Sequence, residues 1–330
     1  MHHIKWILAS VAITAAASAA TAQTVPTIRV AFNAPGDEAK LLMREHPELF
    51  PALGRDYKID WMQLQGTATV SQALVAGTVD CGVSAPLTLA QAITAAKLDP
   101  VLLGATIGES PESFTSYWAV KDDSSIRSPV DLKGKTVAVN TIGSQLDVFT
   151  RMWLQQHGLD PNRDVNIAEV PFPLAETALR QGRVHSIILV QPFASRAEAA
   201  GGLRKVGSLR EVQPDLLNLI EVCRRAFVEE HPEAAAQYAK DFAAASERFS
   251  SDKPGSIALI AKTLKLPAPA LEGFMFTEHD YQRYPDGAIS LPSVQKSFDL
   301  FFDNGLLPTK LDAKAYIVPG VSLVAKEGAQ

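Results

Sequence analysis

Residues that usually build catalytic or metal centres are scarce in this sequence. Its 330 residues include two cysteines and seven histidines, and no H-E-x-x-H, His-x-His or C-x-x-C spacing occurs after residue 22. A G-x-S-x-G nucleophile turn, a G-x-G-x-x-G dinucleotide loop and a complete phosphate-binding loop are also missing. The sequence therefore predicts a protein that is not an enzyme, with no catalytic residue, no bound metal and no cofactor.

Long apolar runs are confined to the amino-terminal end of the chain. Residues 1–22 combine Lys5, an apolar stretch over residues 6–20 and the sequence Ala20-Thr21-Ala22, which is the pattern of a secretory signal peptide. The apolar stretch is shorter than the roughly 20 residues that a membrane-spanning helix needs. No cysteine follows it to carry a lipid anchor. We therefore expect the signal peptide to be cleaved and the chain from Gln23 onward to be soluble in the periplasm.

Charge of either sign is not in strong excess. A formal net charge of −5 makes the chain a poor nucleic-acid binder. Its length exceeds the usual size of one hydrophobic core, so we expect two lobes.

Cys81 and Cys223 could pair in an oxidising compartment. Their sequence surroundings differ, however, and Cys81 lies in an apolar strand, which favours buried free thiols.

Short β-rich runs alternate with helical stretches, which is typical of α/β units around a largely parallel sheet. We expect strands at residues 27–32, 58–63, 81–83, 101–105, 136–140, 166–170 and 186–190. Residues 116–120 are expected to cross between the lobes and residues 218–222 to return as a strand. After Phe227 we expect helices that pack back on the first lobe. Residues 73–86 and 178–192 share an order of helix, glycine, strand and proline, which favours two similarly built lobes.

Small residues with hydroxyl or amide groups follow the predicted strands. In open α/β sheets, ligands bind beyond the carboxyl ends of the strands, where helix N-termini present backbone N–H groups. Together with hydroxyls, these groups can bind a sulfonate or carboxylate without lysine or arginine. The predicted ligand-binding residues are Asn33, Gly66, Thr67, Ser84, Thr115, Ser116, Tyr117, Asn140, Thr141, Gly143, Ser144 and Gln191.

Several of these assignments have structural alternatives. Three hydroxyl residues could act only as helix N-caps, namely Thr67, Ser84 and Ser144. Four aromatic residues could line the pocket or belong to the core, namely Tyr117, Trp118, Phe172 and Phe193. Four acidic residues near the predicted cleft would favour a ligand with an amine if they point inward, namely Asp37, Glu38, Glu109 and Asp147. The charge of the ligand therefore stays open.

Residues 128–139, with the sequence SPVDLKGKTVAV, resemble a run that opens the second lobe of sulfonate-, taurine- and nitrate-binding proteins. This group is described as NMT1/THI5-like or SsuA/TauA-like, and the resemblance continues at residues 157–161, 178–184 and 227–233. It implies a type II periplasmic-binding fold, an α/β architecture of two lobes with a hinge of two crossover strands. The first lobe would comprise residues 23–117 and 220–330, and the second lobe residues 118–219.

The resemblance implies a periplasmic receptor for an ABC importer. Such a receptor is expected to be a monomer that captures a small organic anion, a sulfonate or a carboxylate that could be aromatic, and passes it to a permease at the inner membrane. One alternative is a sensory binding protein that docks on a chemoreceptor or kinase. Another is a thiamin-pyrimidine-related binding protein or enzyme, although the two separated cysteines do not supply the Cys-rich motif of that activity.

Overall fold

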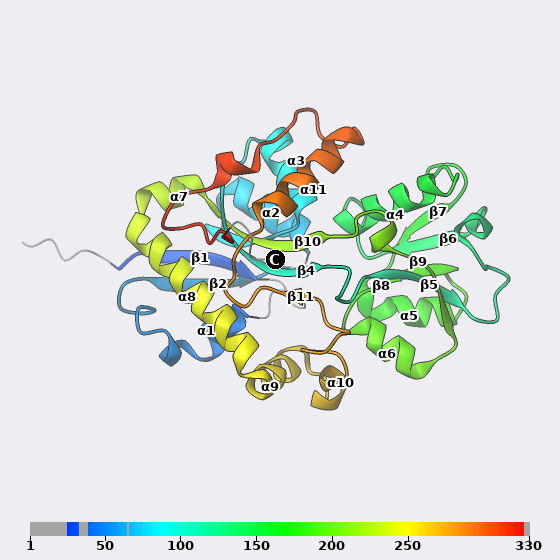
Figure 1. Ribbon diagram of the computed structural model, residues 1–330, viewed down its shortest axis with the longest axis horizontal. Coiled ribbons are helices and arrows are strands. Elements are labelled where there is room, and N and C mark those ends of the chain that lie inside the picture. The colour runs from blue at the N-terminus through cyan, green and yellow to red at the C-terminus, as the bar shows by residue number, and fades with distance from the viewer. Residues whose placement is uncertain (1–24, 33–38, 65, 327–330) are drawn as a thin grey trace, which may run out of the picture.

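The computed structural model describes residues 25–32, 39–64 and 66–326. Its strands form two separate sheets that lie side by side (Figure 1). The predicted signal peptide lies outside the described residues, as does Asn33. Within the described part of the chain, no helix has both the length and the apolar character needed to cross a membrane.

The first sheet has six strands in the order β11-β4-β10-β3-β1-β2. These strands are β1 Thr27–Phe32, β2 Lys58–Gln63, β3 Cys81–Ser84, β4 Pro100–Glu109, β10 Leu216–Arg224 and β11 Gln282–Arg283. Strands β2, β1 and β3 run parallel, whereas β10 is antiparallel to both β3 and β4. The first lobe is therefore assembled from two distant parts of the chain.

Helices cover both faces of the first sheet (Figure 1). On one face lie α2 Thr67–Ala76, α3 Pro86–Ala96 and α11 Leu291–Asp303. On the other lie α1 Leu41–Glu45, α8 Pro232–Ser251, α9 Lys253–Leu264 and α10 Ala268–Glu272, while α7 Arg225–Glu230 follows β10 directly. The carboxyl-terminal helices thus pack on the first lobe, as predicted. The two-residue strand β11 was not predicted, because its residues Gln282 and Arg283 carry no β-rich run.

The second sheet has five strands in the order β7-β6-β8-β5-β9. They are β5 Tyr117–Lys121, β6 Thr136–Val139, β7 Asn166–Glu169, β8 Ser186–Leu189 and β9 Leu203–Ser208. Helix α4 Gln145–Gln156 packs on one face, and α5 Phe172–Arg180 and α6 Phe193–Ala200 pack on the other. Strand β9 was missed because its residues Arg204 and Lys205 interrupt any apolar run, which an edge strand tolerates.

Two segments cross between the sheets. Residues 110–116 lead from β4 to β5, and residues 209–215 lead from β9 back to β10. The expected crossing strand 116–120 is largely β5 itself, which lies inside the second sheet. The exact limits of the two lobes, predicted at residues 117/118 and 219/220, stay a prediction.

The two cysteines form a disulfide, so the expectation of free thiols is wrong. Strand β10 pairs with β3 in a register that sets Cys223 directly opposite Cys81, with 4.0 Å between their Cα atoms. The two residues are 142 positions apart, and this pairing depends on the return of the chain into the first sheet. The return of the chain at residues 218–222 was predicted, but its pairing with β3 was not, and the unlike surroundings of the two cysteines therefore misled the prediction.

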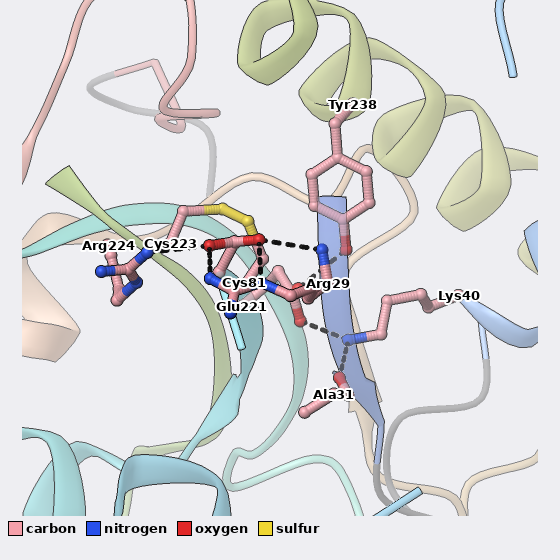
Figure 2. Close-up of a disulfide and its surroundings, with 9 residues drawn as sticks. Arg29, Ala31, Lys40, Cys81, Glu221, Cys223, Arg224 and Tyr238 are labelled. Carbon is pink, nitrogen blue, oxygen red and sulfur yellow. Dashed lines mark hydrogen bonds and ion pairs between the residues drawn. A yellow bond between two sulfur atoms is a disulfide. The ribbon is translucent and has the colours of Figure 1, made fainter. Parts of the chain in front are cut away.

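Buried charges surround the disulfide (Figure 2). The ammonium of Lys40 donates to Glu221 Oε2 at 2.6 Å and to the carbonyl of Ala31 at 3.0 Å, and the side chains of both Lys40 and Glu221 are fully buried. The hydroxyl of Tyr238, on α8, donates to Glu221 Oε1 at 2.8 Å. These contacts tie β10 to β1, to α8 and to the residue that precedes α1.

We expect replacement of both Cys81 and Cys223 by alanine to lower the free energy of unfolding by about 2–5 kcal/mol, because the disulfide restricts a long loop in the unfolded chain. Urea unfolding monitored by circular dichroism measures this difference. As a control, adding a thiol reductant should move the natural protein toward the variant and leave the variant unchanged. Equal unfolding midpoints for the natural and variant proteins would show that the disulfide contributes nothing to stability.

Candidate functional site

The starts of several helices meet between the two sheets. The backbone N–H of Leu87, in the first turn of α3, donates to Gln145 Oε1 at the first residue of α4, at 3.0 Å. The ring of Phe149 on α4 packs against Phe301 on α11, with 6.0 Å between ring centroids. Because α3 and α11 pack on the first sheet and α4 on the second, these contacts join the two halves of the structure, and a ligand cleft beside them stays a prediction.

On the first-lobe side, Gly66 and Thr67 lie at the start of α2. Gly66 is the N-cap residue, with φ of +77°, a left-handed conformation that favours glycine. Thr67 is therefore the first helical residue and not an N-cap. Its hydroxyl has no hydrogen-bond partner among the described residues, and its side chain is partly exposed. A ligand at this helix start could bind both that hydroxyl and the backbone N–H groups of the first turn.

Ser84, at the end of β3, is fully buried. Its hydroxyl lies 2.8 Å from Ser71 Oγ and 3.1 Å from Thr88 Oγ1, so it joins α2 to α3. Ala85, and not Ser84, is the N-cap residue of α3. The hydroxyl of Ser84 is thus engaged within the protein, and contact with a ligand stays a prediction.

On the second-lobe side, four predicted residues lie between β6 and α4: Asn140, Thr141, Gly143 and Ser144. Ser144 is the N-cap residue, as its capping-box pattern predicted, and its Oγ accepts from the N–H of Asp147 and donates to Asn140 Oδ1. The N–H of Gly143 donates to Asp147 Oδ2 at 2.8 Å. Thr141 is exposed, and its hydroxyl has no hydrogen-bond partner in the described parts of the chain.

Thr115 and Ser116 belong to the first crossing segment and bind the buried carboxylate of Glu109. Ser116 donates its hydroxyl to Glu109 Oε1 at 2.7 Å and its N–H to Oε2 at 3.1 Å. Asn218, on β10, adds its amide at 3.3 Å. Burial raises the pKa of Glu109, opposed by these hydrogen bonds. Glu109 therefore links the start of the second lobe to the strand that returns from it.

Gln191 is buried and connects α6 to the carboxyl-terminal segment of the first lobe. Its Nε2 donates to the carbonyl of His279 at 3.0 Å, and its own N–H donates to the Tyr281 hydroxyl at 3.2 Å. Its Oε1 accepts from the N–H of Ser195. Both ends of the side-chain amide are engaged, so Gln191 bridges the lobes in this structure, and ligand contact by it stays a prediction.

The aromatic residues near the cleft divide into two groups. Trp118 is fully buried and stacks on Trp153 at 4.1 Å between ring centroids, so it belongs to the core. Phe172 and Phe193 are half-buried and stack on each other at the starts of α5 and α6, 6.0 Å apart. This second pair lies at the edge of the second sheet that faces the first lobe, whereas Tyr117, the fourth aromatic residue, is buried on β5 with its hydroxyl bonded to Glu198.

A cavity of about 460 Å³ lies beside the crossing segments, and sequence reasoning missed it. It is lined in part by Tyr117 and Thr115, which were predicted to face the cleft, and by Lys205 and Arg210. The last two lie on β9 and in the short helical turn that follows it. If β9 had been predicted from the sequence as an edge strand beside β5, the cavity that these two strands line could have been predicted as well. No group of three or more metal-binding side chains occurs within the described residues.

Comparison with known proteins relates the chain to a group of binding proteins. Residues 21–265 match the model of the NMT1-like family. The chain is 26% identical over 326 residues to a protein of Escherichia coli (strain K12) assigned as an aliphatic sulfonates-binding protein, which covers 98% of each sequence. It is 25% identical over 229 residues to the taurine-binding periplasmic protein of the same organism, covering 66% of this chain and 67% of that protein.

The fold also matches solved structures. The alkanesulfonate-binding protein SsuA from Xanthomonas axonopodis pv. citri, bound to MOPS, superposes with a TM-score of 0.70 at 21% sequence identity, covering 88% of this chain and 98% of that one. Two sheets joined by two crossing segments are thus arranged here as in the type II periplasmic-binding fold, as the sequence predicted.

We expect Glu109→Gln to change how stability depends on pH. Because burial raises the pKa of Glu109 above its ordinary value of 4.5, its contribution to stability is fully present below pH 4.5 and is lost as the pH rises through the raised value. Glutamine keeps the shape but cannot ionise. The natural protein should therefore lose stability relative to the variant from about pH 4.5 upward. Urea unfolding of both proteins across this pH range measures the difference in their free energies of unfolding. A difference that does not vary with pH would contradict a raised pKa for Glu109.

Proposed function

The chain belongs to the NMT1-like family, and from this premise we propose that it captures a small organic anion between its lobes and delivers it to an ABC importer. It is a solute-binding protein and not an enzyme. The relatives with which it aligns are named as binding proteins too. We further propose that it acts in the periplasm as a monomer, after cleavage of residues 1–22, and that its partner is a permease at the inner membrane.

The observation that carries this proposal is the meeting of helix starts across the two lobes. Helices α3 and α4 are joined at their first turns by the 3.0 Å contact of Leu87 with Gln145, and α2 packs beside α3 in the first lobe. Helix N-termini carry partial positive charge and unpaired N–H groups, so they favour the oxygens of an anion. A site of this kind binds a sulfonate or carboxylate without a lysine or arginine.

The ligand class is supported by the relatives and by the aromatic pair at the rim. The relatives are named for aliphatic sulfonates and for taurine. Phe172 and Phe193 offer an apolar surface beside the second-lobe helix starts, which suits the organic part of a ligand better than a bare inorganic ion. We therefore favour a sulfonate first and a carboxylate second.

Closure of the lobes around the ligand is the proposed mechanism. Within the described residues the chain crosses between the sheets at 110–116 and 209–215, so rotation about these segments changes the separation of the lobes with little change inside either one. A ligand that contacts α2 on one side and α4 on the other gains both sets of contacts only in the closed form. It therefore shifts the population toward that form.

A thermal-shift screen tests the proposed function. Residues 23–330, freed of co-purified ligand by unfolding and refolding, would be screened against sulfonates, aliphatic and aromatic carboxylates, nitrate, pyrimidines and amines. A ligand that binds only the folded state raises its apparent stability. A dose-dependent rise confined to sulfonates or carboxylates is expected, whereas a rise with amines or pyrimidines alone would contradict the proposed class.

We expect Thr67→Val and Thr141→Val each to weaken binding of the ligand found in that screen by about five- to tenfold, because each removes one hydroxyl of a hydrogen bond worth roughly 1 kcal/mol. Thr69→Val is the matched control, since Thr69 is exposed and lies on α2 two residues beyond Thr67. Isothermal titration calorimetry measures the affinities. Equal affinities in all three variants and the natural protein would remove both threonines from the site.

A further inference from the structure

The 460 Å³ cavity is built from three parts of the molecule and includes two of the predicted ligand-binding residues, Thr115 and Tyr117. Ser113, Phe114 and Thr115 of the first crossing segment line one side. The second side is formed by β5, β9 and the carboxyl-terminal half of α6, and the third by Glu278 and His279 of the first lobe.

Two of the cations that line the cavity form no ion pair in the described part of the chain. Among the described residues, neither Lys205 nor Arg210 forms an ion pair. Arg210 donates instead to two backbone carbonyls of the first crossing segment, those of Ser110 and Ser113, each at 3.1 Å. The pKa of Lys205 is lowered by burial and by the charge of Arg210, although Glu211, Glu198 and Glu109 oppose this effect. Neither cation therefore forms an ion pair within the described residues, although the carboxylates of Glu211 and Glu198 attract Lys205 and its side chain is exposed.

The other charged groups of the lining are engaged or face solvent. Glu198 accepts a hydrogen bond from the Tyr117 hydroxyl at 2.7 Å. The side chain of Glu278 is 84% exposed, and that of His279 is 67% exposed. Arg204 donates to the backbone carbonyls of Asp122 and Ile126 and lies 3.8 Å from the Asp122 carboxylate. Among the charged groups of the lining that form no ion pair in the described residues, the two cations Lys205 and Arg210 outnumber the one carboxylate, that of Glu198.

Much of the remaining lining is apolar, and the cavity is large enough for an organic molecule. Phe114, Tyr117, Ala119, Ala197 and Leu203 contribute carbon surface, and Phe114 packs edge-on against Tyr117. The Lys205 ammonium lies 5.4 Å from the centre of the Tyr117 ring. A cavity of 460 Å³ falls in the range of small-molecule sites. Aromatic walls next to a lysine that forms no ion pair among the described residues suit a molecule with a ring at one end and an acid at the other.

We infer that this cavity is a second binding site, for a small organic anion whose acidic group pairs with Lys205 and whose apolar part lies against Tyr117 and Phe114. The site does not depend on the cleft or on the function proposed for it. Because Arg210 holds the two crossing segments together from within this site, its occupant contacts the region about which the lobes would rotate.

Titration with 4-fluorobenzenesulfonate, followed by ¹⁹F NMR, tests the second site on residues 23–330. We expect saturable binding that Lys205→Met weakens about tenfold or more, because a charge-assisted contact is lost, while Lys205→Arg stays within about threefold. Lys58→Met is the matched control, since it removes the charge of an exposed lysine in the first lobe. The neutral 4-fluorobenzenesulfonamide should bind markedly less than the sulfonate. Superimposable titrations for the natural protein and Lys205→Met would overturn the assignment, as would the absence of binding.

Crystals grown with 4-bromobenzenesulfonate separate this site from the cleft. The anomalous signal of bromine is expected beside Tyr117, and it should disappear in Lys205→Met but persist in Lys58→Met. A bromine peak only between α2 and α4 would overturn the second site and would support the proposed function. A peak only in the cavity would support the second site, and the thermal-shift screen would then decide the proposed function by itself.

Discussion

Strand β10 holds the first lobe together. The chain returns through this strand into the middle of the first sheet, where it contacts strands and side chains from distant parts of the sequence. It lies between β3 and β4, it carries Cys223 of the disulfide, and its Glu221 receives the buried ammonium of Lys40. Removing one partner of such a buried ion pair costs several kcal/mol, because the remaining charge has neither water nor a counter-ion. The second lobe is thereby inserted into a closed first lobe and is tied to it at two points.

Because β10 holds the first lobe together, motion between the lobes falls on the segments that cross between them. Each lobe has its own sheet with helices on both faces, whereas only two short segments cross between them. Glu109 and Arg210 are the polar groups that organise those segments, one through Ser116 and Asn218 and the other through backbone carbonyls. The contacts of α3 with α4 and of Gln191 with His279 join the lobes on two sides. These contacts, and that of Phe149 with Phe301, must rearrange when the separation of the lobes changes.

Sequence patterns predicted the architecture better than the chemistry of individual residues. Strands β1 and β2 were predicted to their exact ends, because β-rich runs bounded by turns identify them locally, and the Ser144 cap followed from its spacing to Asp147. Strand β9, the disulfide and the Lys40–Glu221 pair were not predicted, because each depends on partners far away in the chain. For the same reason Ser84 and Gln191 were proposed as ligand contacts, although the structure engages both within the protein.

Distance measurement between the lobes tests the central claim, which is that ligand binding closes them. Spin labels would be attached to cysteines introduced at Val75 on α2 and Leu174 on α5, which are 41% and 60% exposed. The native cysteines are paired and would not react. Pulsed electron paramagnetic resonance with and without a saturating ligand from the thermal-shift screen then reports the distance between the labels. We expect the distribution of distances between the two labels to become shorter and narrower when ligand is bound. Identical distributions while the ligand is bound would contradict it.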